Sequence, residues 1–435
     1  MWKVRCSGDI ARRDGRGAGA NGRICSILGA VSAAARRALY EALAPIVGAG
    51  CCFSPVVMRY ALTNASFYTG STTLTDHAVL ISQGRIEAVL PAAELPAEVP
   101  RQDARGLRVA PGLLDLQVYG GGGVLFSTHP TPATLARLEE VFRQQGTTHF
   151  VATMPTNAPD LMLQALRAAH AYRSATPGTG LLGVHLEGPF INPAKKGAHQ
   201  AEFIREPDLA EIERWLAVGP GLLRLVTMAP EVASTAAVAR LRAAGVVLSA
   251  GHSAATFGEA QRGFRQGFGA ATHLFNAMSA LTSREPGLVG AVYDDAAAAA
   301  SIIADGLHCD FAALRISHKL LRERLFLITD AVEESPEGAY RFRRAGNRFV
   351  DEQGTLAGSA LTMLQAVQNC VLHAGIELSE ALRMATLYPA RVLGLDHELG
   401  RIAPGYQASL SLFDADFRPH GVVLNGELRW TEPGA

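Results

Sequence analysis

Eight short hydrophobic runs recur between Pro111 and Asp330, separated by segments of helix length. The clearest connecting segments, residues 132–145, 160–173, 207–217, 233–244 and 256–267, carry apolar residues at helical spacing. Eightfold alternation of strand and helix predicts a closed parallel (β/α)8 barrel. The eight runs comprise residues 113–118, 149–154, 181–186, 222–228, 246–251, 269–272, 301–304 and 325–329.

An open, doubly wound sheet is the alternative fold for the same alternation. That fold would need a glycine-rich nucleotide-binding loop after its first strand. Gly120 to Gly123 follow the first run, but they lack the Lys-Ser/Thr pair of a phosphate-binding loop and the spacing of a dinucleotide fingerprint. The pattern therefore favours the barrel.

The segments that flank the barrel alternate polar and apolar residues with a period of two, which is typical of strands. Residues 78–90 predict a hairpin that turns at 82–84, and Asn425-Gly426 is a strong type I′ turn signal between two short strands. Neither end alone has enough strands to bury a core. We therefore predict that residues 58–110 and 399–435 form one small β-sandwich domain beside a catalytic barrel of residues 111–398.

Residues 1–57 are rich in arginine and differ from the rest of the chain. An apolar stretch at 24–35 weakly resembles a secretory signal, but the acidic residues before it and Arg36-Arg37 after it do not suit one. We expect a dispensable extension from an upstream start codon, poorly ordered or forming a loose helix over 28–44 that ends at Pro45. Met58 then opens the folded protein.

Composition narrows the class of protein. The 40 basic and 40 acidic residues cancel, and no basic stripe recurs, so nothing indicates a nucleic-acid partner. No apolar run reaches the ~18 residues that a membrane span needs. The six cysteines form no C-x-x-C pair, which favours a reducing compartment and a cytoplasmic location.

Chemically useful side chains stand where the hydrophobic runs end. Glu187, His252, His273 and Asp330 follow the third, fifth, sixth and eighth runs. All strands of a parallel barrel end on one face, so these residues are expected to converge there. A carboxylate and two imidazoles can hold a divalent ion with a position open for water. Asp330 then stands where a proton acceptor is needed, although a helix cap is its alternative role.

Histidine in an apolar setting is more often a hydrogen-bonded core residue than a metal ligand. His185 lies inside the third run, two residues before Glu187, so strand alternation gives it the same face one layer deeper. We therefore expect His185 to be part of the core. His252 and His273 differ from it because both follow the end of a strand.

Eight motifs follow one another in the chain: HLEGPF (185–190), KKGAH (195–199), GHS (251–253), THLFNAM (272–278), REPG (284–287), ADGLH (304–308), TDA (329–331) and LAGS (356–359). Together they resemble the N-acetylglucosamine-6-phosphate deacetylase family of the amidohydrolase superfamily, and the resemblance covers the chain from about Met58 to the C-terminus. It implies a metal-dependent hydrolase on a TIM barrel. It also implies deacetylation of N-acetyl-D-glucosamine 6-phosphate to glucosamine 6-phosphate and acetate, in amino-sugar catabolism and cell-wall recycling.

The resemblance also implies the role of each residue. Glu187, His252 and His273 would hold the metal, Asp330 would be the acid/base residue, and His199 would act on the acetyl carbonyl. The family forms homodimers in which the Arg284 position reaches the phosphate of the neighbouring subunit's substrate. The implied substrate-binding residues are Ala198, His199, Asn276, Ala277, Arg284, His308, Leu356, Ala357, Gly358 and Ser359.

The chain departs from many superfamily members at the first strand. These members carry His-x-His there as ligands for a second metal, whereas this chain has Gln117 and Tyr119, which suit zinc poorly. We therefore predict one divalent ion per chain, zinc as first choice and iron(II) or another divalent ion as the alternative.

Two rival functions stay open. An amidohydrolase that acts on a cyclic amide or a nucleobase would more naturally keep the first-strand histidines, and it would not need Arg284 and His308 together. A barrel without activity that serves as a binding or scaffold protein is the rival of another class, because fold alone does not guarantee chemistry. The four intact residues at the strand ends argue against the second rival.

Overall fold

The computed structural model of the chain describes residues 59–346 and 348–431. The predicted N-terminal extension, with its helix over 28–44, lies outside the described residues.

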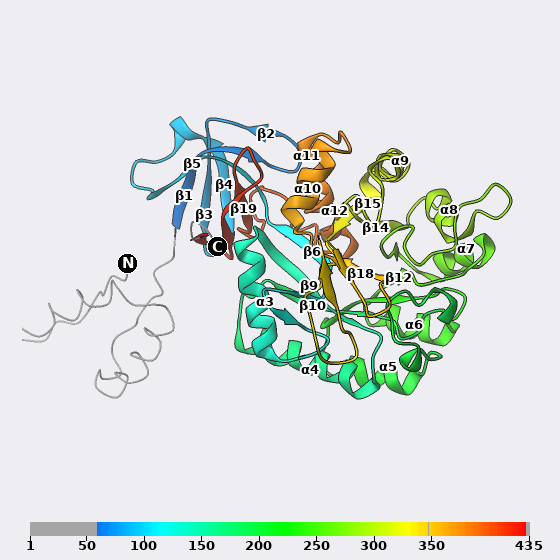
Figure 1. The fold of residues 1–435 in the computed structure, drawn as a ribbon. Coiled ribbons are helices and arrows are strands. Elements are labelled where there is room, and N and C mark those ends of the chain that lie inside the picture. The colour runs from blue at the N-terminus through cyan, green and yellow to red at the C-terminus, as the bar shows by residue number, and fades with distance from the viewer. Residues whose placement is uncertain (1–58, 347, 432–435) are drawn as a thin grey trace, which may run out of the picture. The chain divides into compact units, whose positions relative to one another are not determined.

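Eight parallel strands form a barrel, and they are hydrogen-bonded in the order in which they follow one another along the chain (Figure 1). The first and last strands meet at a parallel bridge between Val118 and Ala331, beside a hydrogen bond of 2.8 Å from Tyr119 N to Ala331 O. The prediction of a barrel is therefore confirmed, and the open sheet is excluded. The strands are β6 (Leu113–Val118), β9 (Thr147–Pro155), β10 (Leu181–Glu187), β11 (Leu223–Met228), β12 (Val247–Ala250), β13 (Ala270–Ala271), β14 (Ala299–Ile303) and β15 (Leu325–Ile328).

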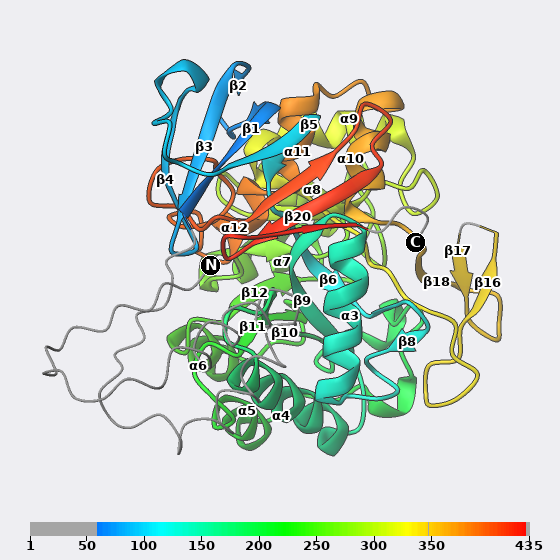
Figure 2. The same cartoon turned by 90° about the vertical axis from the view of Figure 1, so that its left-hand side faces the viewer.

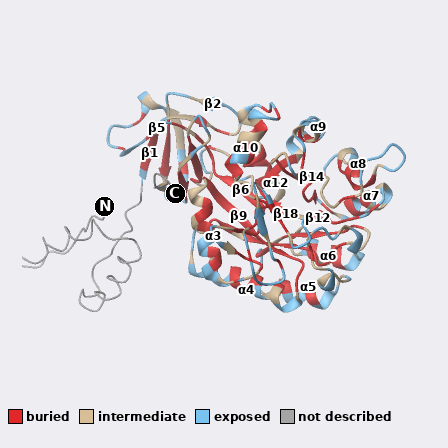
Figure 3. Cartoon of the chain, viewed as in Figure 1, coloured by how far each residue is buried: buried red, intermediate tan, exposed pale blue. Residues whose placement is uncertain are grey.

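Helices cover the outside of the barrel, with α3 packed on β9, α4 on β10 and α6 on β12. Figure 3 shows the buried strands in red inside helices that turn exposed faces outward. Local sequence fixes the helix ends. Thr256 and Glu259 form a capping box at the start of α7, and Gly267 ends that helix with φ +116°, a conformation that favours glycine. The helices are α3 (Pro132–Gln144), α4 (Pro159–Ala175), α5 (Leu209–Leu216), α6 (Thr235–Ala243), α7 (Phe257–Gln266), α8 (Gly287–Asp294), α9 (Phe311–Leu321), α10 (Met363–Leu372), α11 (Leu378–Met384) and α12 (Leu387–Val392).

Both ends of the described chain join in one small β domain, as predicted. Strand β19 pairs antiparallel with β5, and Figure 2 shows the N-terminal strands in blue beside the C-terminal strands in red. The strands expected to form the two layers of a sandwich are hydrogen-bonded into one continuous sheet. Its order is β21-β20-β19-β5-β1-β3-β4, and β2 pairs with β1. Its strands are β1 (Arg59–Tyr68), β2 (Thr73–Leu74), β3 (His77–Ser82), β4 (Arg85–Pro91), β5 (Arg101–Pro111), β19 (Leu410–Phe413), β20 (Pro419–Leu424) and β21 (Glu427–Trp430).

A single hydrophobic core holds the two ends of this domain together. Leu62 and Ile81 from the N-terminal strands pack in one buried cluster with Leu410 and Val423 from the C-terminal strands. Removal of either end would expose the apolar side chains of the other. The predicted hairpins also form, and Asn425 and Gly426 have φ of +49° and +78°, as a type I′ turn requires.

The sequence pattern is least accurate in the second half of the barrel and beyond it. Strand β13 has only two residues, and β14 starts at Ala299, two residues before the predicted run. After β15 the chain forms a small antiparallel sheet of β16 (Arg343–Ala345), β17 (Arg348–Val350) and β18 (Leu356–Ser359) that the pattern does not predict. Strands this short and this rich in arginine give no hydrophobic period.

Among the residues that the structure describes, none belongs to a helix both long enough and apolar enough to cross a membrane.

Candidate metal centre

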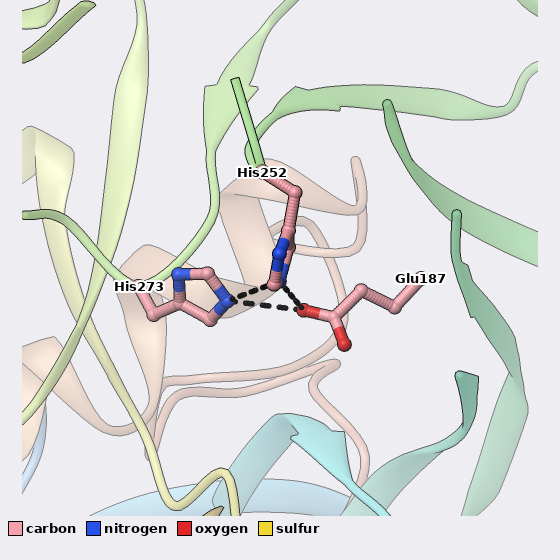
Figure 4. A group of neighbouring side chains, drawn as sticks. All are labelled: Glu187, His252 and His273. Atoms are coloured by element: carbon pink, nitrogen blue, oxygen red, sulfur yellow. Dashed lines mark hydrogen bonds and ion pairs between the residues drawn. The ribbon is translucent and has the colours of Figure 1, made fainter. Parts of the chain in front are cut away.

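Three side chains at the ends of different barrel strands point toward one another (Figure 4). Glu187 is the last residue of β10, while His252 and His273 each stand two residues after the ends of β12 and β13. Glu187 Oε1 lies 3.0 Å from His273 Nε2 and 3.3 Å from His252 Nε2, and the two imidazole nitrogens are 3.2 Å apart. All three residues are buried. The convergence that the strand ends predict is therefore present.

The spacing of these three atoms fits a divalent ion. In a tetrahedral zinc site with bonds of about 2.0 to 2.1 Å, neighbouring ligand atoms lie about 3.3 Å apart. The three separations of 3.0 to 3.3 Å approach that value closely. One carboxylate oxygen and two imidazole nitrogens also match the ligand types of catalytic zinc sites, which keep a position open.

Backbone geometry aims these side chains into the barrel. His252, His273 and Asp330 have φ of +47°, +36° and +55°, a region that residues with a Cβ seldom adopt. Hydrogen bonds hold this unfavourable backbone, because His273 N donates to Ser301 Oγ at 2.7 Å and Asp330 N donates to the backbone oxygen of Gln117 at 3.0 Å. Strained backbone of this kind is characteristic of functional sites.

The ring of His252 is oriented by the backbone of the loop that follows β10. Its Nδ1 lies 2.8 Å from the carbonyl oxygen of Lys195, so Nδ1–H donates and Nε2 keeps its lone pair for an ion. Such contacts behind a ligand fix both the tautomer and the angle of the ring.

Asp330 lies beside the ligand cluster at the end of β15. Its carboxylate accepts from Gln117 Nε2 at 2.8 Å, and its side chain is buried. Burial is the main cause that raises the pKa of Asp330 above its ordinary value, and the negative charge of Glu187 adds to it. A carboxyl group with a raised pKa is suited to accept a proton and return it.

Gln117 and Tyr119 occupy the place at which other superfamily members were expected to hold a second ion. Gln117 Nε2 lies 2.9 Å from Glu187 Oε1, and the Tyr119 hydroxyl donates to Glu187 Oε2. Burial, followed by the charge of Glu187, raises the pKa of Tyr119 well above its usual range, so the phenol stays neutral. These two neutral donors satisfy the carboxylates of Glu187 and Asp330 on that side.

His199 stands on the other side of Glu187. Its Nε2 lies 3.1 Å from Glu187 Oε2, while its Nδ1 accepts from the backbone N–H of Thr156 at 3.3 Å. Burial, with the nearby His252, lowers the pKa of His199 to about 4, so the ring is neutral and its proton sits on Nε2. The hydroxyl of Tyr340 donates to the Thr156 carbonyl and supports the same stretch of backbone. His199 therefore presents an N–H donor toward the site.

A cavity of about 180 Å³ opens over these groups. Most of the predicted site residues line it. Arg284 and Ser359 do not: Arg284 is exposed on a loop, and Ser359 is buried and donates its hydroxyl to the Thr329 carbonyl at 2.6 Å. The predicted residues that line the cavity are Glu187, Ala198, His199, His252, His273, Asn276, Ala277, His308, Asp330, Leu356, Ala357 and Gly358.

His308 is a further histidine that lines the cavity, and it can meet an anion there. Its Nδ1 lies 2.6 Å from Asp305 Oδ2, which fixes the ring. Burial raises the pKa of Asp305, but the hydrogen bond and charge of His308 outweigh it and hold the pKa below its ordinary value. Within the described residues no lysine or arginine lines the cavity.

Tyr340, Phe342 and Val332 also line the cavity, and sequence reasoning missed them. They belong to the segment after β15 that shows no hydrophobic period, so no signal could have found them. His185 behaves as predicted: it is buried one layer below the ligands, with Nε2 2.8 Å from the hydroxyl of Thr227.

A parallel barrel whose strand ends carry a Glu-His-His cluster and a buried aspartate defines a class of metal-dependent hydrolases. Comparison with known proteins agrees. The Amidohydrolase family matches residues 108–429, and the NagA composite domain matches residues 59–109. The chain therefore belongs to the amidohydrolase family.

Particular members of that family are similar over their whole length. N-acetylglucosamine-6-phosphate deacetylase of Haemophilus influenzae is 35% identical over 385 residues, which is 86% of this chain and 100% of that protein. N-acetylgalactosamine-6-phosphate deacetylase of Escherichia coli O157:H7 is 35% identical over 85% of this chain and 99% of that protein. The crystal structure of the Pasteurella multocida N-acetylglucosamine-6-phosphate deacetylase superposes with a TM-score of 0.83 at 33% identity, covering 86% of this chain and all of that one.

Proposed function

We propose that the protein hydrolyses the acetamide of N-acetyl-D-glucosamine 6-phosphate, giving D-glucosamine 6-phosphate and acetate. The observation that carries the proposal is the convergence of Glu187, His252 and His273 with Asp330 and His199 in one cavity. The similarity to deacetylases of amino-sugar phosphates over 85% or more of the chain supports it.

The ion is expected at Glu187, His252 and His273, and zinc is our first choice because two imidazoles and a carboxylate are its common ligands. When bound, a divalent ion acidifies water and polarises a carbonyl group. Gln117 and Tyr119 support a single ion per chain. The neutral amide of Gln117 donates to Asp330 Oδ1, and the neutral hydroxyl of Tyr119 donates to Glu187 Oε2. Iron(II) or another divalent ion stays the alternative, since this ligand set accepts several.

Two residues do the proton work in this proposal. Asp330 accepts a proton from water while the water oxygen attacks the amide carbon, and the raised pKa of its carboxyl group favours protonation. The Nε2–H of His199, which donates to Glu187 Oε2 in the structure, would turn to the amide oxygen as negative charge develops there. Asp330 then protonates the nitrogen as the C–N bond breaks. The water oxygen ends in acetate, and both water hydrogens end on the nitrogen, which leaves as the ammonium form of the product.

The phosphate end of the substrate needs a cation beyond His308. A guanidinium group can donate two parallel hydrogen bonds to phosphate oxygens. Arg284 is exposed on a loop and does not line the cavity of the same chain. We therefore propose a homodimer in which Arg284 of each subunit completes the site of the other.

We place this reaction in the cytoplasm, as part of amino-sugar catabolism and cell-wall recycling. The two cysteines in the described residues, Cys309 and Cys370, are free and buried, which is compatible with a reducing compartment.

Measured release of acetate tests the function. We expect turnover of N-acetylglucosamine 6-phosphate, loss of turnover after dialysis against a chelator, and recovery with Zn²⁺. Unphosphorylated N-acetylglucosamine should react at least tenfold less efficiently, because it lacks the group that His308 and Arg284 contact. The galactosamine epimer belongs in the same assay, since the similarity to its deacetylase is equal in identity. If neither epimer releases acetate with metal present, the proposed function is wrong. The protein would then act on another amide substrate or serve as a scaffold.

A further inference from the structure

Glu231 links the loops around the metal ligand His252, although no motif in the sequence marks it. It follows β11, at the third residue after the strand ends, and its side chain is half-buried. Glu231 Oε1 accepts from Ala254 N at 2.7 Å and from Asn192 Nδ2 at 2.9 Å. Glu231 Oε2 accepts from Ser253 Oγ at 2.6 Å. One carboxylate therefore ties the loop after β10 to the loop after β12.

The first arm of this link runs through Asn192 to the back of the His252 ring. Asn192 N donates to His252 O at 2.9 Å, and Asn192 O accepts from Lys195 N at 2.9 Å. Asn192 Oδ1 also caps the turn by accepting from Ala194 N at 2.9 Å. These bonds set the place of the Lys195 carbonyl, to which His252 Nδ1–H donates. The position of Asn192 thus bears on the angle at which His252 Nε2 meets an ion.

The second arm holds the backbone directly after His252. Ser253 and Ala254 are the next two residues, and Glu231 accepts from both. His252 itself has φ +47°, which costs on the order of 1 kcal/mol or more and persists only where neighbouring contacts enforce it. The carboxylate of Glu231 supplies two of those contacts.

We propose that Glu231 is a positioning residue for the metal centre, which sets the orientation of His252 through both arms and thereby raises affinity for the ion. It touches neither the cavity nor the three ligand side chains. The inference rests on the proposed metal site, but not on the identity of the substrate. Partners behind a metal ligand typically contribute tenfold to a hundredfold in metal affinity.

Zinc affinity of the full chain tests this role without any assay of turnover. Metal-free protein is titrated with Zn²⁺ in competition with a chromophoric chelator. Glu231→Ala should bind Zn²⁺ about tenfold to a hundredfold more weakly than the parent chain. Glu231→Gln should recover most of the affinity, because its amide oxygen can still accept from Ala254 and Asn192.

Glu259 gives a matched control. It is also a half-buried glutamate, and it accepts from the N–H and hydroxyl of Thr256 at the start of α7 and pairs with Arg262 at 3.9 Å. Unlike Glu231, it bonds neither to the two residues that follow His252 nor to the loop after β10. Glu259→Ala should therefore lose stability but keep the zinc affinity of the parent. If Glu231 only stabilised the loops and did not orient His252, Glu231→Ala and Glu259→Ala would have the same zinc affinity.

Two outcomes would overturn the proposal. Zinc affinity of folded Glu231→Ala within twofold of the parent would remove the role of Glu231 while leaving the metal site intact. No zinc binding by the parent chain would remove the metal site itself. Should Glu231→Ala fail to fold, Asn192→Ala decides the matter in the same titration, because it removes only one arm: an affinity about tenfold weaker supports the proposal, and an unchanged one contradicts it.

Discussion

The two ends of the cavity are built in different ways. At the metal end, Glu187, His252 and His273 come from the ends of three strands of one chain, and their ligand atoms lie 3.0 to 3.3 Å apart. At the end proposed for the phosphate, His308 lines the cavity, and Arg284 is exposed outside it. All three proposed ligands are thus in place within one chain, whereas no arginine or lysine of the described residues lines the cavity.

This difference follows from what supports each end. Strand ends of a closed barrel are fixed by hydrogen bonds to both neighbouring strands, so side chains placed there converge. Loops have no such frame, and their functional residues depend on what they pack against. Changes at the metal end should therefore act within one chain, and changes at the phosphate end should act between chains.

The largest effect is expected for Asp330→Asn at the metal end. Loss of its proton transfer should lower kcat roughly a hundredfold to ten-thousandfold. Bound zinc per chain should stay unchanged, since Asp330 is not a ligand. Steady-state acetate release and metal analysis measure the two quantities. Asp294→Asn, at an exposed aspartate of α8, is the control, and a kcat of Asp330→Asn near that of the control would refute the role.

Arg284→Ala tests the phosphate end. Loss of a charge-assisted bond worth about 1.5 to 3 kcal/mol should lower kcat/KM by about tenfold to a hundredfold, with zinc content unchanged. Arg284→Lys should recover only part, because an ammonium group lacks the bidentate fork.

Mixing the two variants would sharpen the comparison further. In a mixed dimer, the Arg284→Ala chain keeps its Asp330 and receives Arg284 from the Asp330→Asn chain. Acetate release should therefore rise after subunit exchange above the sum of the separate variants. Activity that stays at that sum, with exchange shown by differently tagged chains, would place Arg284 within its own site or outside any site.

A smaller effect is expected from Asp305→Asn, which weakens the bond that orients His308. The KM for the phosphorylated substrate should rise several-fold while kcat changes little, because the contact proposed for His308 is with the phosphate and not with the reacting amide. A fall in kcat at constant KM would instead connect His308 with the chemical step.

The smallest effect concerns stability rather than activity. Burial raises the pKa of Asp115, under the metal end, to about 7, although its bonds with Thr329 and Gln117 act in the opposite direction. A folded-state pKa above the unfolded value of 3.8 means that the contribution to stability is present at low pH and is lost as pH rises. Between about pH 4 and 7, the parent should therefore lose free energy of unfolding relative to Asp115→Asn, by up to ~1.4 kcal/mol per pH unit. Urea unfolding of both chains at several pH values checks this, and parallel curves would contradict it.

The same contrast explains which residues of the site could be predicted from the sequence. The ligands and Asp330 can be predicted because each one follows a hydrophobic run, and the strands of a parallel barrel bring such ends to one face. Tyr340 and Glu231 could not be placed, since they lie in segments without a period and act through long-range contacts with Thr156 and Asn192. Ser359 is expected to line the cavity, but it is buried with its hydroxyl bonded to the Thr329 carbonyl, because a motif does not say which way each of its side chains points.

The stoichiometry of activation by zinc tests the central claim most directly. Metal-free protein receives Zn²⁺ in fractions of an equivalent, and acetate release from N-acetylglucosamine 6-phosphate is measured after each addition. The account predicts that activity rises linearly and stops at one equivalent per chain. Activity that continues to rise to two equivalents, or that is present in full before any metal is added, would contradict it.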